Sequence, residues 1–287
     1  MQKLIVLAFI GFIAQLVDGA LGMAYGVTST SLLLLSGIAP AVASASVHMA
    51  EVVTTAASGI SHLKFGNVDK EILKKIIIPG SIGAFTGACF LSHIPGEAVK
   101  PFISVFLLSL GFFVIYRFVR KGNKPGKKRI RPKRKQLVPL GFAAGFLDAT
   151  GGGGWGPVAT PVLLANHKME PRKVIGTVDT SEFFIAVSAT LGFIISLGWE
   201  QISFQWVLAL MIGGIFAAPI AAWLVKIFPS VILGTLVGGV IILTNTRVLL
   251  STLKFSGKFP FYIYGKIILL WFAAIISLWL RFKREKQ

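Results

Sequence analysis

The chain is poor in charged residues and contains a single cysteine. Of its 287 residues, 14% are charged and 54% are hydrophobic, and eleven acidic residues stand against 29 basic ones. A water-soluble globular protein needs more polar surface than this to cover itself. The composition therefore excludes a soluble protein and indicates one that lies in a membrane, and the lone Cys89 excludes a disulfide within the chain.

Long hydrophobic stretches fill the sequence between its few charged residues. Most have the roughly 20 residues that an α-helix needs to cross a bilayer, whereas β-barrel strands would be about half as long. We therefore expect an all-α polytopic membrane protein. Its expected hydrophobic stretches are residues 4–35, 41–63, 76–94, 98–118, 137–165, 174–197, 206–225, 231–250 and 261–280. The first of these resembles a signal peptide, but its pattern recurs in mid-chain, so we expect it to be retained in the fold.

One segment occurs twice. GFIAQLVDGALGMAYGVTSTSLLL, at residues 11–34, reappears 130 positions later as GFAAGFLDATGGGGWGPVATPVLL. The match pairs Asp18 with Asp148 and then, at a shift of 131, Glu51 with Glu182. We expect two membrane repeats with a linker and an additional C-terminal helix. The expected parts are residues 1–119 (first repeat), 120–136 (basic linker), 137–253 (second repeat) and 254–287 (C-terminal helix and basic tail).

Each repeat opens with a stretch that is too long for one ordinary crossing. A helix of thirty-odd residues would span about 45 to 50 Å at ~1.5 Å per residue. Glycines interrupt both stretches midway, at residues 19–26 and 149–157. We predict a helical hairpin or a discontinuous helix in each, with the unwound part inside the protein, where its amides can find partners. Such interruptions at matching places in two halves are typical of the binding site of a secondary transporter.

The distribution of basic residues predicts the orientation. Eleven of the 29 Lys and Arg residues fall between Arg117 and Lys135, so the positive-inside rule makes this linker cytoplasmic. If the broken stretches are hairpins, 23 basic residues lie on that side, against 20 if they are single crossings. The hairpin interpretation makes the two repeats inverted with respect to each other and returns the C-terminus to the cytoplasm. The basic linker is most simply an orientation signal, so we expect no nucleic-acid partner.

Five of the eleven acidic residues lie within hydrophobic stretches: Asp18, Glu51, Asp148, Asp179 and Glu182. An ionised carboxylate at the bilayer centre costs about 3 kcal/mol even on the lenient insertion scale, so such groups usually mark a functional cavity. A structural alternative applies to Asp18 and Asp148. Both directly precede a glycine break, where an aspartate can cap the exposed amides of a helix start.

A polar stripe follows one face of the second stretch. Its members, at helical spacings of three and four, are Ser44, His48, Glu51, Thr55, Ser58 and His62. His48 and Glu51 favour a solvated path or a proton-handling pair. The alternative is hydrogen bonding between helices, which Ser and Thr commonly make in membrane bundles. The second repeat keeps only Thr177, Asp179 and Glu182 of this stripe, so any pathway is asymmetric.

The repeated motif resembles that of a known family. GFIAQLVDGALGMAYG and GFAAGFLDATGGGGWGP, each followed by a segment of small residues and joined through a basic loop, are similar to the TauE/SafE group, the sulfite exporter family. The resemblance covers nearly the whole chain except the basic linker and tail. It implies an anion transporter of a bacterial or archaeal cytoplasmic membrane that handles sulfite, sulfonates or other small anions. We accordingly expect no enzymatic activity, no cofactor and no bound metal; a homodimer is compatible with the sequence.

The broken helices suggest how an anion could be held without a basic residue, since none lies within either glycine motif. Backbone amides and the positive end of a helix dipole can bind an oxyanion. The residues expected to bind substrate are Gly19, Gly22, Gly26, Thr28, Ser29, Thr30, Gly151, Gly152, Gly153, Gly154, Gly156 and Thr160. The residues expected to form a proton-coupling or polar pathway are Asp18, His48, Glu51, Asp148, Asp179 and Glu182. Glu51 and Glu182 are the leading candidates for binding a proton.

Three alternatives share these residues. An anion channel would use the same groups as a carrier. An intramembrane enzyme could use His48, Glu51, Asp179 and Glu182 as metal ligands, but the chain lacks HExxH and Gly-x-Ser-x-Gly motifs. A structural subunit of a larger assembly is the third. The sequence leaves the substrate, the direction of transport and the coupling ion open.

Overall fold

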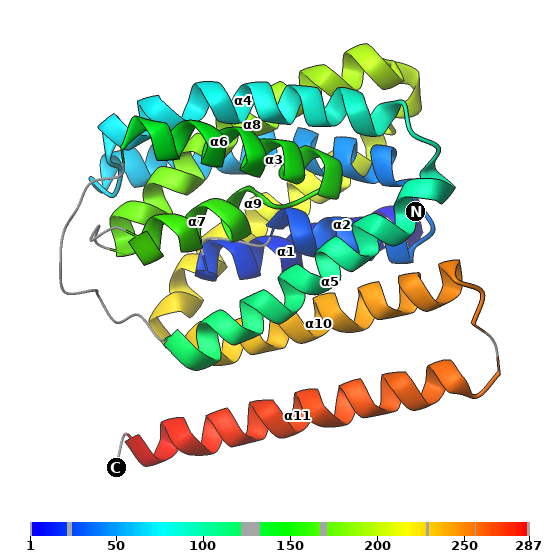
Figure 1. Ribbon diagram of the computed structural model, residues 1–287. Coiled ribbons are helices and arrows are strands. Elements are labelled where there is room, and N and C mark those ends of the chain that lie inside the picture. Colours follow the sequence, from blue (N-terminus) through cyan, green and yellow to red (C-terminus); the bar gives the residue numbers. More distant parts are fainter. Residues whose placement is uncertain are drawn as a thin grey trace.

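The computed structural model describes residues 2–21, 25–121, 133–166, 171–227, 230–255 and 257–285. These residues form a bundle of helices with no strand among them (Figure 1). The helices are α1 (Gln2–Leu21), α2 (Tyr25–Leu35), α3 (Pro40–Lys64), α4 (Lys70–Ser92), α5 (Gly96–Lys121), α6 (Arg134–Gly151), α7 (Trp155–Asn166), α8 (Pro171–Leu197), the short 3-10 turn η1 (Trp199–Gln201), α9 (Phe204–Ile227), α10 (Ser230–Thr252) and α11 (Phe259–Glu285). Most of the basic linker, residues 122–132, lies outside the described residues.

The expectation of an all-α polytopic membrane protein is confirmed. Four described helical stretches are long and apolar enough to cross a membrane: Lys70–Ser92, Gly96–Phe113, Lys173–Leu197 and Phe259–Leu280. Shorter apolar helical segments occur at Leu4–Leu16, Tyr25–Leu35 and Phe204–Ala217. α3 has 25 residues and is long enough to cross a membrane, but its polar stripe lowers its mean hydropathy, so it is not among these apolar stretches.

Both glycine-broken stretches fold back on themselves. α1 begins and α2 ends at one end of the bundle, whereas α6 begins and α7 ends at the opposite end (Figure 1). Leu7 in α1 and Gly37 after α2 line the same cavity, which places both ends of the first hairpin together. The hairpin form of the prediction therefore describes the chain. That the repeats are inverted with respect to a membrane remains a prediction.

The main helix contacts join one repeat to the other. In two crossed pairs, α1 packs on α9, and α6, the counterpart of α1, packs on α4. In addition, α3 packs on α8, and α5 packs on α10. Close approach at glycine allows the two crossed pairs to form. A Cβ on Gly145 would come within 3.0 Å of the Ala84 amide nitrogen, and a Cβ on Gly141 would come within 3.0 Å of the Ile76 carbonyl oxygen. Small residues that let helix backbones approach in this way are common in membrane helix interfaces.

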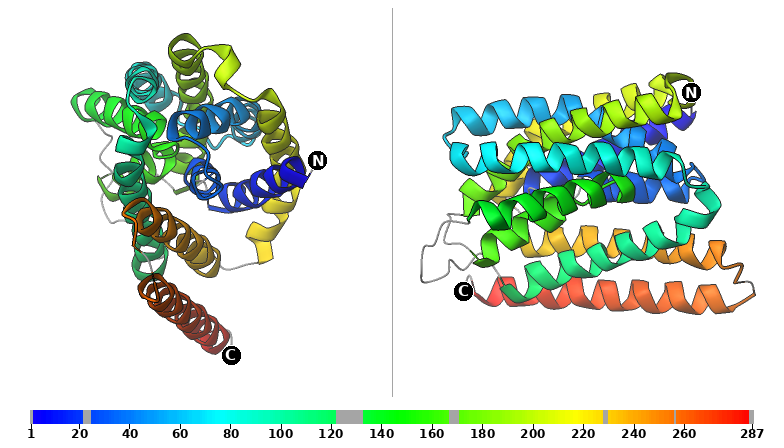
Figure 2. Two further views of the ribbon diagram at one scale, coloured as in Figure 1. Left: turned by 90° about the vertical axis from the view of Figure 1, so that its right-hand side faces the viewer. Right: turned by 45° about the horizontal axis from the view of Figure 1, so that its top comes forward.

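α11 lies at the edge of the bundle and packs against α10 (Figure 2). The Trp271 indole N–H donates to the Thr235 carbonyl at 2.8 Å. None of the residues in the apolar stretch Phe259–Leu280 is buried within the chain. A helix this apolar and this uncovered requires a non-aqueous surrounding.

Candidate functional site

The break between α6 and α7 is buried and closed by one aspartate. Gly152 and Gly153 have φ angles of 68° and 148°, a region that favours glycine. Asp148 Oδ1 accepts hydrogen bonds from the amides of Gly154 at 2.6 Å and Trp155 at 2.9 Å. The Asp148 carbonyl accepts the amides of Gly152 and Gly153. The capping alternative is thus confirmed for Asp148, which accepts the amides of three of the glycines expected to bind substrate: Gly152, Gly153 and Gly154.

An aspartate also caps the helix that follows the first break. Asp18 Oδ1 accepts the Tyr25 amide at 3.3 Å, at the first residue of α2. Gly19 belongs to the last turn of α1, and Gly22 lies outside the described residues. The carboxylate of Asp18 therefore faces the start of α2, as the repeat relation with Asp148 predicts.

The two breaks meet at the centre of the molecule. The Thr30 hydroxyl in α2 donates to the Gly152 carbonyl. A Cβ added to Gly26 would lie 2.7 Å from Gly153 Cα and 3.0 Å from Glu51 Oε1. Glycine at position 26 is thus required for close approach rather than for an unusual backbone angle. This contact brings the start of α2 onto the unwound part of the second repeat.

The polar stripe of α3 divides between two partners. The N-terminal part of the stripe faces the α6–α7 break: Ser44 Oγ donates to the Ala149 carbonyl at 2.6 Å, and His48 Nε2 lies 3.0 Å from Asp148 Oδ2. The C-terminal part faces α8, where Ser58 Oγ donates to Asp179 Oδ2 at 2.7 Å. The alternative of hydrogen bonding between helices is confirmed for Ser44, His48 and Ser58.

Three of the predicted pathway carboxylates converge. One oxygen from each of Asp18, Asp179 and Glu182 lies within 4.8 Å of the other two. Glu51 is buried, and its Oε1 would lie 3.0 Å from a Cβ on Gly26, at the contact between the two breaks. The six expected pathway residues thus comprise the Asp18–Asp179–Glu182 cluster, the His48–Asp148 pair and the buried Glu51, and they come from α1, α3, α6 and α8.

Three of the predicted substrate hydroxyls are buried without a partner. Thr28, Ser29 and Thr160 are at most 1% exposed, and their hydroxyls make no hydrogen bond within the described chain. Buried hydroxyls are normally satisfied, so each is a candidate ligand group. The glycines Gly151 and Gly156 are buried on either side of the break. Thr30, by contrast, is already committed to Gly152.

Three neutral residues with polar side-chain atoms were not among the predicted site residues: Tyr25 and Trp155 within the two motifs, and Asn245 outside them. Tyr25 and Asn245 are buried, and the Tyr25 hydroxyl and Asn245 Oδ1 have no hydrogen-bond partner among described residues. Asn245 Nδ2 donates to Ser31 Oγ at 2.7 Å, which ties α10 to α2. Trp155 also escaped notice; its indole N–H donates to the Val178 carbonyl and to Ser181 Oγ, both at 3.1 Å. A search for every polar residue within the hydrophobic stretches would have found Asn245.

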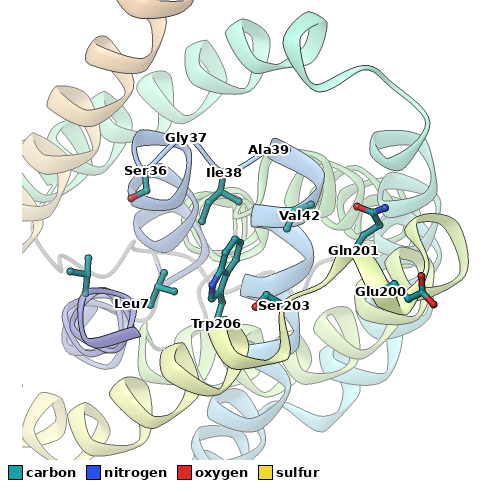
Figure 3. A pocket seen from close by; sticks show the side chains of 11 residues that line it. Leu7, Ser36, Gly37, Ile38, Ala39, Val42, Glu200, Gln201, Ser203 and Trp206 are labelled. Carbon is teal, nitrogen blue, oxygen red and sulfur yellow. The ribbon is translucent and has the colours of Figure 1, made fainter. Parts of the chain in front are cut away.

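A cavity of about 840 Å³ opens at the end of the bundle where α2 joins α3. Figure 3 shows side chains around it from α1 (Leu7), the α2–α3 connection (Ile38), α3 (Val42) and α9 (Trp206). None of the predicted site residues lines this cavity. It therefore lies apart from the polar centre, toward the end of the molecule opposite to the start of α6 (Figure 1).

A bundle of apolar helices in which two broken pairs meet at a buried polar centre defines a membrane transporter. Residues 7–248 match the family described as Sulfite exporter TauE/SafE, so the chain belongs to that family. It is also 62% identical, over 278 residues, to the Probable membrane transporter protein YtnM of Bacillus subtilis (strain 168), which covers 96% of this chain and 92% of that protein. No solved structure matches the chain. The protein is therefore a multi-pass membrane transporter and not an enzyme.

Proposed function

We propose that the protein is a secondary transporter that moves a small anion, such as sulfite, a sulfonate or a related organic anion, across the cytoplasmic membrane. The observation that carries this proposal is the set of buried hydroxyls on α2 and α7, the second halves of the two broken helices, that have no hydrogen-bond partner among the described residues. Thr28, Ser29 and Thr160 can donate to an oxyanion, and the buried surroundings strengthen such bonds. The family description names a sulfite exporter and supports the choice of solute class.

Asp148 stands in the place of the transported anion in this proposal. Its carboxylate takes the amides of Gly154 and Trp155, the groups that an oxyanion would use at the start of α7. A free anion can bind there only if the carboxylate gives up the two amides. A proton on Asp148 removes its charge and weakens both bonds, so proton uptake and anion binding favour each other.

The contacts of His48 support a proton held at this position. Nδ1 lies 2.8 Å from the Ser44 carbonyl and Nε2 lies 3.0 Å from Asp148 Oδ2, and both of these oxygens are acceptors. A neutral histidine has one N–H, so donation to both oxygens at once takes one additional proton on the His48–Asp148 pair; without it, Nδ1 can accept from the Ser44 hydroxyl at 3.3 Å. Glu51, whose Oε1 has no hydrogen-bond partner among described residues, is the next carboxylate along the path.

The orientation in the membrane follows the same proposal. Lys64, Lys70, Lys133 and Lys173 lie on the connections or helix starts at the end of the bundle where α6 begins (Figure 1). The Lys173 ammonium donates to the Gly66 carbonyl at 2.6 Å, which joins two of these segments. The positive-inside rule makes this end, with the basic linker and the C-terminus, cytoplasmic.

The substrate site is tested by removing the orphan hydroxyls. Thr28→Val and Thr160→Val keep the side-chain shape, and each should raise the KM for sulfite uptake into proteoliposomes roughly tenfold to a hundredfold. That range follows from the ~1.5 to 3 kcal/mol of a hydrogen bond to a charged group. Thr86→Val is the matched control, because Thr86 is exposed and its hydroxyl bonds only within α4. Unchanged KM values in both central variants would exclude this anion site, and the absence of counterflow would favour a channel.

The proton claim is tested with Asp148→Asn. The asparagine side chain cannot take up and release a proton as the carboxylate of Asp148 does in this proposal. The dependence of flux on a pH gradient should therefore disappear. Asp69→Asn is the matched control, because Asp69 also caps a helix, accepting the amides of Glu71 and Ile72, away from the centre. A gradient dependence that survives in Asp148→Asn would rule out Asp148 as the coupling group.

A further inference from the structure

The carboxylate cluster of Asp18, Asp179 and Glu182 has a geometry that the anion and proton steps do not use. Asp179 and Glu182 are three residues apart on α8, so they share a helix face. Asp18 reaches them from α1, in the other repeat. Their nearest oxygens all lie within 4.8 Å of one another. Three carboxylates this close in the interior of a membrane protein strongly repel one another if they are ionised.

The neighbouring groups do not neutralise the cluster. Asp179 accepts the Ser58 hydroxyl and has the His62 ring at 3.7 Å, and Asp18 accepts the Tyr25 amide. Within the described part of the chain, no Lys or Arg forms an ion pair with any of the three carboxylates. The described groups that contact Asp18 and Asp179 are thus one hydroxyl, one backbone amide and one histidine ring.

A second observation is independent of the cluster. Glu51 is 1% exposed, and its Oε1 has no hydrogen-bond partner among described residues. This oxygen would lie 3.0 Å from a Cβ on Gly26, the residue next to Tyr25, whose amide donates to Asp18 in the cluster. Buried polar atoms are normally satisfied, so an orphan carboxylate oxygen at this place indicates a missing ligand.

We propose that Asp18, Asp179 and Glu182 bind one metal cation that prefers oxygen ligands. Calcium–oxygen bonds are about 2.3 to 2.6 Å long, so oxygens on opposite sides of such an ion are at most about 5 Å apart, which matches the cluster. The last turn of α1 adds a second attraction, because Asp18 precedes the C-terminal end of that helix, where the dipole is negative. This proposal differs from the expectation, drawn from the sequence, that the chain binds no metal.

The cation also answers a difficulty of the anion site. Among the described residues, the centre of the protein holds five carboxylates and one histidine, His48, and no buried Lys or Arg that could attract an anion. A bound cation reduces the negative charge next to the broken helices, so an anion can enter. Its role in transport rests on the proposed function, whereas its binding can be measured without any solute.

The test uses the full chain, purified in detergent with sodium replaced by N-methylglucamine. The unfolding temperature is followed during separate titrations with sodium, calcium and magnesium chlorides, with choline chloride as the ionic-strength control. Equilibrium dialysis then counts bound ions. We expect at least one of the three metal ions to raise the unfolding temperature in a saturable manner and to bind once per chain. If none of them does more than choline, the proposal is wrong.

Variants locate the site. Asp18→Asn, Asp179→Asn and Glu182→Gln should each weaken cation binding at least roughly tenfold, since even a group outside the metal's ligand shell commonly costs that much. Glu97→Gln, at an exposed position at the start of α5, should bind as the unmodified chain does.

Glu182→Asp keeps the carboxylate and should retain binding if Glu182→Gln fails to fold. Equal affinity in all three neutral variants would overturn the assignment. If the unmodified chain binds the cation but moves no sulfite in proteoliposomes, the proposed function is wrong and the cation site still holds.

Discussion

The contact between the two breaks makes a specific prediction for Gly26. A Cβ at this position would lie 2.7 Å from Gly153 Cα, 3.0 Å from Glu51 Oε1 and 3.0 Å from the Gly152 carbonyl oxygen. Two of these three atoms belong to the backbone, so no side-chain rotation can relieve the overlap. Gly26→Ala therefore has to separate α2 from the second break.

The magnitude follows from two opposing effects. Alanine is better than glycine within a helix by about 1 kcal/mol, and overpacking of a filled interior costs about 1 to 3 kcal/mol. The net loss expected for Gly26→Ala is thus up to about 2 kcal/mol. Gly265 in α11 is the matched control, because an added Cβ there meets nothing within 4 Å. Gly265→Ala should leave stability equal to or slightly above that of the unmodified chain.

The assay is thermal unfolding of both variants in detergent, followed by sulfite uptake in proteoliposomes. Gly26→Ala should unfold at a lower temperature and lose most of its uptake, because the Thr30 hydroxyl can no longer reach the Gly152 carbonyl. A Gly26→Ala variant as stable and as active as Gly265→Ala would mean that the two breaks do not touch.

Three further outcomes follow from the same centre. Glu51→Gln should reduce the dependence of uptake on a pH gradient while leaving the protein folded, and an unchanged gradient response would remove Glu51 from the proton path. Trp155→Phe keeps the packing but loses the indole N–H that serves Val178 and Ser181, so unfolding should become easier by about 1 kcal/mol as measured by thermal or denaturant unfolding. Asn245→Ala removes the bond to Ser31 and should destabilise the protein by about 0.5 to 1.5 kcal/mol, and no loss of stability would mean that α10 is not tied to α2.

The helices could be predicted because hydrophobic length and glycine interruptions act locally. The run of glycines after Asp148 disfavours a continuous helix, and the chain does break at residues 152–154. The expected stretch 98–118 contains the middle of α5, whose bounds are Gly96–Lys121. Asp148 was recognised as a possible cap from its position alone, since a cap needs only a short carboxylate next to free amides.

The site was less predictable, because contacts between distant segments carry no local signal. Thr30 and Gly152 are 122 positions apart, and their hydrogen bond turns a predicted substrate donor into a structural one. The spacing of Asp179 and Glu182 placed them on one helix face, but nothing in the sequence brought Asp18 to them. The spacing of His48 and Glu51 favoured a solvated path or a proton-handling pair, but it gave no sign that the His48 ring lies 3.0 Å from Asp148 in the other repeat.

By itself, the sequence determined the environment and the elements of this protein: a hydrophobic composition that requires a bilayer, a duplicated motif, and breaks where glycine weakens a helix. The tertiary structure decided which polar groups remain available. It assigned the amides at the start of α7 to Asp148 and gathered three carboxylates from two helices. It left the hydroxyls of Thr28, Ser29 and Thr160 without a hydrogen-bond partner in the part of the chain that the structure describes. The physical reason is that a buried polar group takes the nearest suitable partner in space, and only packing determines which partner that is.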